Sequence, residues 1–439
     1  MTKRPSIAKT ALLLLPLQIV FRGGEALFPI LIATWFGRTD ATDVYYFTWA
    51  VFTFAGSLVF SAYQDSALIP ILAETRVKEP KLLPAVMGSL LAHTLAFGGL
   101  LAAVIALVAL GWFRFRYAAA DFAVAAPMVL PFAGYLVALS VKTFFGALLN
   151  AAHKYFPFTI ASALGMVATL GTILVSKGTL GVLAVPIGSL VGEVVAIGVL
   201  VYAAVVAGGM RIRPTFERPE PVRQFAKLMA SEVAGGAVTR INPVVDQLMA
   251  GLAGVIGGAT LLKNTADVAT VPTSLLQATL LPVLLSHLAD DFGARNFARI
   301  RATVRRALLA VSALLVAASA LVYLVRAPLL RLAFLHGAMD AAGVDRMVKL
   351  LPYHLVGLAP FGALLVLARA HVAIKNSRIM ISMGVLNAAL NALFNVILLR
   401  AIGLEGIALS TSCVYLAVAV VFWIRLEAKL DRLEREVAA

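Results

Sequence analysis

The sequence has few of the residues on which soluble enzymes rely. Its one cysteine, Cys413, allows no intramolecular disulfide and gives no indication of a redox compartment. Its six histidines are scattered along the chain, which argues against a histidine metal site. The short motifs of nucleotide-binding loops, zinc proteases, serine hydrolases and dithiol oxidoreductases are absent. We therefore expect a protein that is not an enzyme and carries no cofactor, apart from a possible coupling Na⁺ or H⁺.

Charged residues are also scarce. They make up 13% of the 439 residues, whereas hydrophobic residues make up 61% and the mean hydropathy is +0.93. This composition lies far above that of a soluble globular domain. The net charge of +15 does not indicate nucleic-acid binding, because the basic residues are spread over many short loops between apolar segments. The composition predicts a polytopic protein of the lipid bilayer.

The apolar segments predict an all-α membrane protein with about twelve transmembrane helices. About 20 apolar residues are needed for each crossing. The first segment follows three basic residues like a signal peptide, but it has no small-residue cleavage site, so we interpret it as a helix. The predicted spans are 10–36, 42–73, 82–111, 121–150, 156–176, 179–207, 223–252, 256–287, 302–325, 344–372, 379–400 and 404–426.

The distribution of basic residues predicts the orientation of these helices. With the N-terminus inside, the 37 Lys and Arg residues divide into 23 on inside segments, 9 on outside loops and five within spans. Inside loops of membrane proteins carry the excess of positive charge. Both termini are therefore expected in the cytoplasm.

The two halves of the chain share corresponding motifs, which indicates an internal repeat. GTLGVLA at Gly178–Ala184 parallels GLEGIAL at Gly403–Leu409, and Pro70 and Pro282 end corresponding second helices. The longest inside loop, Gly208–Arg223, is rich in proline and charge and reads as a linker. The pattern predicts two pseudo-symmetric six-helix lobes, as in transporters built from repeats. The expected parts are an N-terminal lobe at 1–207, a cytoplasmic linker at 208–222, a C-terminal lobe at 223–426 and a cytoplasmic tail at 427–439.

Charged residues within the apolar segments carry the strongest functional signal. Each costs about 2.5–3.5 kcal/mol on insertion scales and usually faces a bundle interior or a wet cavity. A structural anchor has no use for so many, whereas a transporter does. The bases are Arg22, Lys142, Arg240, Lys263 and Arg369, and the acids are Glu25, Asp43, Asp65, Glu193, Glu232, Asp246 and Asp267.

The first helix of each half carries an arginine near its middle, Arg22 and Arg240. Arginine suits phosphate because its guanidinium binds two oxygens at once. Arg22 and Glu25 are also i,i+3 neighbours, so an ion pair within the helix is an alternative to contact with an anionic substrate.

Asn387, Asn391 and Asn395 follow one another at i, i+4 and i+8 on the eleventh span. Hydrogen bonding between helices is one explanation, since asparagine does this in membranes. The other is a cation site, in which carboxylate, amide and carbonyl oxygens gather around a hard ion. Sodium or a proton is the usual ion at such a site.

Eight short stretches occur in an order that runs nearly from end to end. They are FG-x-x-x-ATD-x-x-x at Phe36–Tyr46, IPILAE at Ile69–Glu74, GALLNAAHKYFPFT at Gly146–Thr159, IN-x-x-x-D at Ile241–Asp246, AD-x-x-x-x-P-x-S at Ala266–Ser274, LHGAMDAAGV at Leu335–Val344, LARAHVAIKNSR at Leu367–Arg378 and GLEGIALSTS at Gly403–Ser412. Together they resemble the MurJ (MviN) lipid II flippases of the multidrug/oligosaccharidyl-lipid/polysaccharide exporter superfamily.

The resemblance implies a lipid flippase in the bacterial inner membrane. Its partner would be a polyprenyl-diphosphate-linked saccharide, either lipid II or another surface polysaccharide precursor, moved from the inner to the outer leaflet by alternating access. A monomer and no nucleic-acid partner are expected. The alternative is an exporter of small cationic drugs or metabolites coupled to Na⁺ or H⁺, which the acidic residues within the spans motivate.

The candidate residues follow from the charges within the spans and from the resemblance. For the sodium site known in the family, Asp246, Asn391 and Thr411 match, and Asn395 stands where a carboxylate is expected. The loss of that carboxylate predicts weaker sodium binding. The candidate substrate-binding residues are Arg22, Glu25, Asp43, Arg240, Lys263, Asp267 and Arg369.

Overall fold

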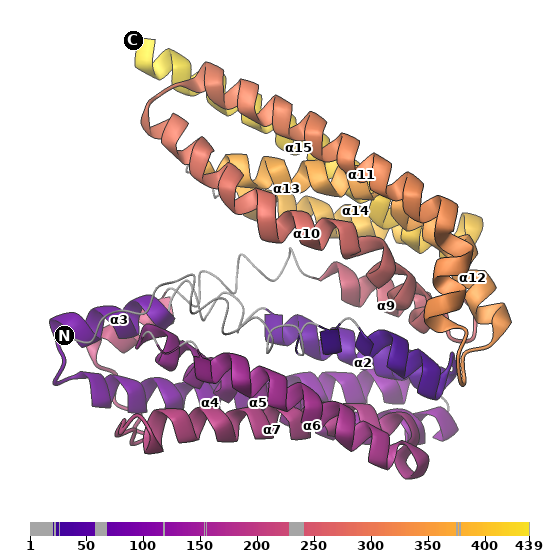
Figure 1. Cartoon of the computed structure of the whole chain (residues 1–439), viewed down its shortest axis with the longest axis horizontal. Helices are drawn as coiled ribbons and strands as arrows, with labels where there is room; N and C mark the ends of the chain where they lie inside the picture. The colour runs from indigo at the N-terminus through magenta and orange to yellow at the C-terminus, as the bar shows by residue number, and fades with distance from the viewer. Residues whose placement is uncertain are drawn as a thin grey trace. The chain divides into compact units, whose positions relative to one another are not determined.

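Helices are the only regular secondary structure in the part of the chain that the structure describes (Figure 1). The structure is a computed structural model, and the predicted all-α membrane fold is confirmed. The chain forms two compact units, Met1–Phe36 with Val44–Ala234, and Gly37–Asp43 with Gly235–Ala439. The described residues are 21, 23–25, 27–57, 68–116, 119–152, 154, 156–227, 241–374, 376 and 379–438.

The first unit is a bundle of long apolar helices that pack side by side (Figure 1). α4 and α5 contact each other, and α5 contacts α7. The bounds of α4, α5 and α6 agree with the predicted spans to within five residues. The elements are α2 (Asp40–Gly56), α3 (Ile69–Lys78), α4 (Leu83–Arg116), α5 (Ala119–Ala151), α6 (Phe156–Leu180), η3 (Gly181–Leu183), α7 (Ala184–Val201) and η4 (Tyr202–Val206).

α6 and α7 form a tight helical hairpin. The helical run from Phe156 to Val206 is 51 residues long, about twice what one crossing needs. It reverses at the short η3 turn, where Gly181 has a φ of +56°. The two helices approach closely at Gly192, which has no side chain: a Cβ added there would lie 2.0 Å from Thr169 Oγ1. Small residues at such crossings allow membrane helices to pack.

An aromatic cluster joins α2 to α5. The Phe132 ring of α5 lies 5.9 Å from the rings of Tyr45 and Trp49 and 5.6 Å from that of Phe52. Phe132, Tyr45 and Phe52 are almost completely buried. Large aromatic surfaces contribute strongly to core packing, so this cluster anchors the body of α2 to the first unit.

The first part of the stretch predicted as a linker, residues 209–219, lies against α4 without regular secondary structure, and a helix begins at Glu220. The Ser89 hydroxyl donates to the Glu217 carbonyl, and the Arg218 guanidinium donates to His93 Nε2 at 3.3 Å. A Cβ on Gly88 would lie 1.9 Å from the Arg213 carbonyl oxygen, so only glycine permits this approach. Residues 209–219 are therefore bound along α4, and this segment is called the strap below.

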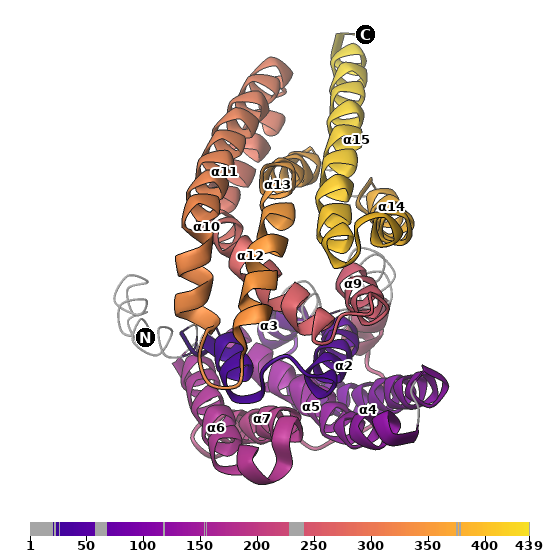
Figure 2. The ribbon, with the colours of Figure 1, turned by 90° about the vertical axis from the view of Figure 1, so that its right-hand side faces the viewer.

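The second unit contains the remaining helices (Figure 2). α12 and α13 bend by 41° at a short break. α14 and α15 lie side by side, and α10 contacts α11 and α13. The elements are α9 (Asn242–Gly251), α10 (Gly258–Gly293), α11 (Phe297–Phe334), α12 (Ala341–Leu355), α13 (Leu358–Ala373), α14 (Ile379–Ile402) and α15 (Leu404–Ala438).

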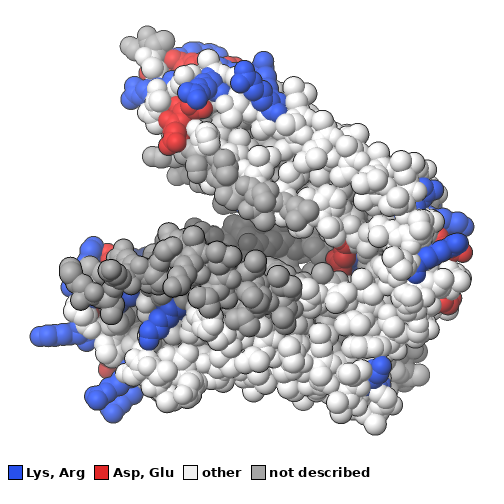
Figure 3. Space-filling model, in the orientation of Figure 1, with Lys and Arg blue, Asp and Glu red and all other residues white. Residues whose placement is uncertain are grey.

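Length and apolarity identify the membrane-crossing helices. Within the described ranges six helical runs qualify, and the bent α12–α13 pair adds a seventh. One of the six is the α6–α7 hairpin, which supplies two crossings. On the face that Figure 3 shows, most Lys, Arg, Asp and Glu residues of each unit lie toward the helix ends, and the surface between them carries little charge. This banding suits a bilayer, whose hydrocarbon core excludes charge.

The segment Gly37–Asp43 belongs to the second unit because its side chains bind there. The Arg38 guanidinium donates to both carboxylate oxygens of Asp340, at 2.7 and 2.9 Å, and to the Ile256 carbonyl at 3.1 Å. Asp340 also accepts from the Gly343 N–H at the start of α12. The Arg38 hydrogen bond holds the pKa of the Asp340 carboxyl below its usual range.

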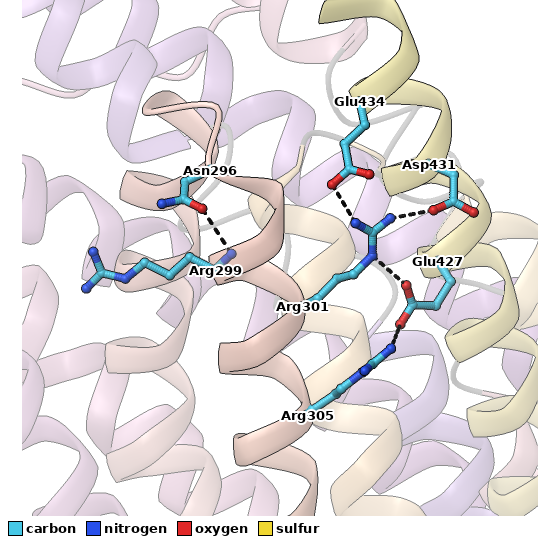
Figure 4. A network of polar contacts seen from close by, with 7 residues as sticks. All are labelled: Asn296, Arg299, Arg301, Arg305, Glu427, Asp431 and Glu434. Atoms are coloured by element: carbon cyan, nitrogen blue, oxygen red, sulfur yellow. Dashed lines mark hydrogen bonds and ion pairs between the residues drawn. The ribbon is translucent and has the colours of Figure 1, made fainter. Parts of the chain in front are cut away.

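An ion-pair network joins the ends of α11 and α15 (Figure 4). Arg301 donates to Glu427 at 2.8 Å and to Asp431 and Glu434 at 2.5 Å each, and Arg305 reaches Glu427 at 3.3 Å. These carboxylates lie in the predicted tail, which continues α15 as a helix to Ala438.

Candidate functional site

Four polar residues predicted as a cation site come together in the second unit. Asp246, on α9, accepts hydrogen bonds on Oδ1 from the amide nitrogens of Asn391 at 3.0 Å and Asn395 at 2.7 Å. Its Oδ2 accepts from the Thr411 hydroxyl of α15 at 3.2 Å. The two asparagines are adjacent because i and i+4 share one face of α14.

The chemistry of this cluster fits a hard monovalent cation. Asn391 and Asn395 are completely buried, and Asn395 Oδ1 has no hydrogen-bond partner among the described residues. The cluster thus offers a carboxylate, two amide groups and a hydroxyl, whose oxygens are the ligands that such ions prefer. Within the described ranges, this cluster included, no group of three or more His, Cys, Asp or Glu residues is placed to hold a metal.

The third asparagine of the predicted stripe makes no hydrogen bond to Asp246. Asn387 lies one turn earlier on α14, and its Oδ1 is buried without a partner in the described part of the chain. Of the three asparagines, Asn391 and Asn395 therefore belong to the cluster around Asp246.

A cavity of about 230 Å³ opens beside Asp246 within the second unit. α10 lines one side with Lys263 and Asp267, whose ammonium and carboxylate lie 2.5 Å apart. Gln247 and His354 line it from α9 and α12. The structure thus brings Lys263 and Asp267, predicted as substrate-binding, to the same cavity as the candidate cation site.

Sequence reasoning missed Gln247 and His354. Each is a single polar residue in an apolar stretch, which is a weak signal without knowledge of its neighbours. Gln247 Oε1 and His354 Nε2 are both buried and have no hydrogen-bond partner among the described residues. Buried polar atoms normally have partners, so these two atoms mark the cavity as a place for a polar occupant.

Asp43, in the first turn of α2, places its carboxylate against the N-terminal end of α10. Its Oδ1 accepts from the backbone N–H and the hydroxyl of Thr260, each at 2.8 Å. A carboxylate is favoured there because the first N–H groups of a helix lack partners within it. This position stabilises the helix end, and contact of Asp43 with substrate stays a prediction.

Two other predicted substrate-binding residues, Glu25 and Arg369, do not line the cavity beside Asp246. Glu25 and Arg369, on α13, are exposed on the protein surface. Arg22 and Arg240 lie outside the described residues. Their roles stay predictions.

Lys142 and Glu193, two of the charges within apolar helices, are each other's partner. The Lys142 ammonium of α5 lies 2.6 Å from Glu193 Oε1 of α7, and both side chains are mostly buried. Pairing explains why the two charges are tolerated in a membrane bundle. This pair lies in the first unit, which does not contain the Asp246 cluster.

Solved structures of transporters share this fold. A lipid II flippase MurJ in an inward closed conformation is 17% identical, with a TM-score of 0.77 over 95% of this chain and 87% of that one. An inward-facing MATE family multidrug resistance transporter of the MOP superfamily is 13% identical, with a TM-score of 0.78 over 95% and 96%. A MOP superfamily transporter from Pyrococcus furiosus is 13% identical, with a TM-score of 0.62 over 96% and 95%.

At these identities the structural neighbours establish the fold alone. Curated protein sequences give no match. The sequence profile described as lipid II flippase MurJ, in contrast, matches residues 32–437, nearly the whole chain. The chain therefore belongs to the MurJ family of lipid II flippases.

Proposed function

We propose that this protein moves a polyprenyl-diphosphate-linked saccharide from the inner to the outer leaflet of the bacterial inner membrane. The observation that carries the proposal is the family match over residues 32–437. The long apolar helices of both units support action within a bilayer. The cationic-drug exporter predicted as an alternative has less support, because the family match is to lipid flippases.

Depletion of the protein tests this proposal. Cells that lose it should accumulate a lipid-linked saccharide on the inner leaflet, and a profile of these lipids would identify the glycan. An unchanged profile together with sensitivity to cationic drugs would favour the exporter instead.

Arg22 and Arg240 are proposed to bind the diphosphate. Arg22→Ala and Arg240→Ala should each abolish flipping at normal protein level, and lysine should restore it poorly because it lacks the bidentate guanidinium. Arg400→Ala, at the exposed end of α14, is the matched control and should flip normally. Wild-type flipping by the double alanine variant would contradict this role.

The Asp246 cluster is proposed to bind the coupling cation, either Na⁺ or a proton. Such a cation would join α9, α14 and α15 and would bias the transport cycle by its differential affinity for the two states. Asn395 provides a neutral oxygen where a second carboxylate would add charge, so sodium binding should be weak.

Transport into vesicles with imposed gradients tests the coupling. Asp246→Asn should uncouple transport from the gradient, and Asn395→Asp should strengthen its dependence on sodium. If neither a sodium nor a pH gradient matters and Asp246→Asn transports normally, the cluster only holds the helices together.

Orientation and assembly complete the proposal. Both termini and the strap on α4 would be cytoplasmic, since the inside segments carry most of the basic residues. The transporting unit would be a monomer, because each chain contains both predicted lobes.

A further inference from the structure

The cavity beside Asp246 has an open rim and a closed floor. Lys263, Asp267 and Thr270 form the rim, spaced at i, i+4 and i+7 on one face of α10. The side chains of Lys263 and Asp267 are 33% and 35% exposed, and Thr270 is exposed. The floor contains Asp246 and Gln247, the latter only 5% exposed.

The cavity wall has hydrogen-bonding capacity that the described residues do not use. Gln247 Oε1 and His354 Nε2 are buried without partners. A buried polar group without a hydrogen bond costs about 1–3 kcal/mol. A cavity of this volume has room for several water molecules, which can donate to Gln247 Oε1. The wall is therefore suited to a hydrated occupant.

The charges around the cavity favour a cation. Asp246 and Asp267 contribute two formal negative charges, and Lys263 contributes one positive charge. The sum of −1 acts in a concave, mostly apolar surrounding, where the field of such groups is strong. The aromatic pair of Phe361 and Tyr415, with ring centroids 4.6 Å apart, lines the same cavity.

We propose that this cavity is the entry route by which a small hydrated monovalent cation reaches Asp246, with Asp267 at the rim as its charge filter. Lys263 holds the Asp267 carboxylate at the rim and keeps the net charge low enough for the cation to move on. The inference rests on the proposed function, in which Asp246 binds the coupling cation, and adds the direction from which that cation arrives.

Cysteine labelling in a Cys413→Ala background tests the route. Thr270→Cys places a thiol at the rim, and Val271→Cys is the matched control on the neighbouring, exposed position that does not line the cavity. The probes are a cationic methanethiosulfonate, the ethylammonium reagent, and an anionic one, the ethylsulfonate reagent. The protein is reconstituted in vesicles.

The rim thiol should react about tenfold faster with the cationic than with the anionic reagent, as expected for a site that concentrates one sign of charge. Asp267→Asn should reduce this ratio toward that of Val271→Cys. Sodium chloride should slow the labelling of Thr270→Cys more than choline chloride at the same concentration, and Asp246→Asn should remove the difference.

Equal rates for the two reagents at Thr270→Cys would overturn the proposed route. So would an absence of any sodium effect on labelling in protein whose transport still depends on a sodium gradient, since the ion would then reach Asp246 from elsewhere. Failure of the proposed coupling role of Asp246 is distinguishable, because in that case transport would respond to neither a sodium gradient nor a pH gradient.

Discussion

The Lys142–Glu193 pair gives the sharpest prediction about stability. The ammonium and the carboxylate lie 2.6 Å apart, and their side chains are only 15% and 12% exposed. The second carboxylate oxygen, Glu193 Oε2, is buried and has no partner in the described residues. Removing the lysine would therefore leave a whole carboxylate without compensation in an apolar bundle.

Lys142→Met should lower the free energy of unfolding by about 3–5 kcal/mol, the usual cost of breaking a buried pair from one side. At the middle of that range the folding equilibrium falls roughly a thousandfold. Glu193→Gln leaves the Lys142 ammonium without a counter-charge, but it should cost less, because the amide oxygen can still accept a hydrogen bond from that ammonium. Replacing both residues, Lys142→Met with Glu193→Gln, should recover most of the loss, since a neutral pair carries no buried charge.

Equilibrium unfolding of purified protein in mixed micelles measures these values as a double-mutant cycle. The exposed Lys78–Glu74 pair is the control, and Lys78→Met should cause no measurable change. A double variant destabilised by the full sum of the two single changes would refute the reasoning, because it would show that the two charges do not interact.

Three further predictions concern the parts of the chain outside the bundle cores. Gly88→Val should lift the strap from α4, because a Cβ there would lie 1.9 Å from the Arg213 carbonyl oxygen, and proteolysis of the strap should become faster. The Asp340 carboxyl has its pKa lowered by Arg38, so the stability from this pair is full above the unfolded pKa of about 3.9 and lost as the pH falls through the lower folded value. The Asp340→Asn variant should therefore have a lower free energy of unfolding than the wild-type protein at neutral pH. This difference should shrink below about pH 4, as measured by unfolding at a series of acidic pH values. Phe216 is 68% exposed on the strap, and a cysteine there, in a background without the natural cysteine, should resist an impermeant reagent outside intact cells and react after permeabilisation.

Much of the fold could be predicted because it depends on local properties of the sequence. The hydrophobic length of each segment defined α4, α5 and α14 to within a few residues. The turn between α6 and α7 was predictable from Gly178–Ala184, where glycines interrupt the apolar run. The helical continuation of the tail to Ala438 was not predicted, because its stability comes from ion pairs to Arg301 on a distant helix.

The sequence by itself determined that the chain is a two-lobed membrane transporter and that Asp246, Asn391, Asn395 and Thr411 belong together. Membrane crossing follows from residue composition over about 20 positions, and the family resemblance follows from ordered motifs. Only the tertiary structure decided the partners of the remaining polar groups. It paired Lys142 with Glu193, which are 51 residues apart.

The structure also placed the Asp43 carboxylate against the N-terminal end of α10 and put Gln247 and His354 on one cavity with Asp246. These arrangements depend on which faces of distant helices meet. Hydrophobicity fixes which segments enter the bilayer, but the rotation and neighbours of each helix are set by packing between helices. The rotation and the neighbours of a helix therefore cannot be deduced from the short stretch of sequence that forms it.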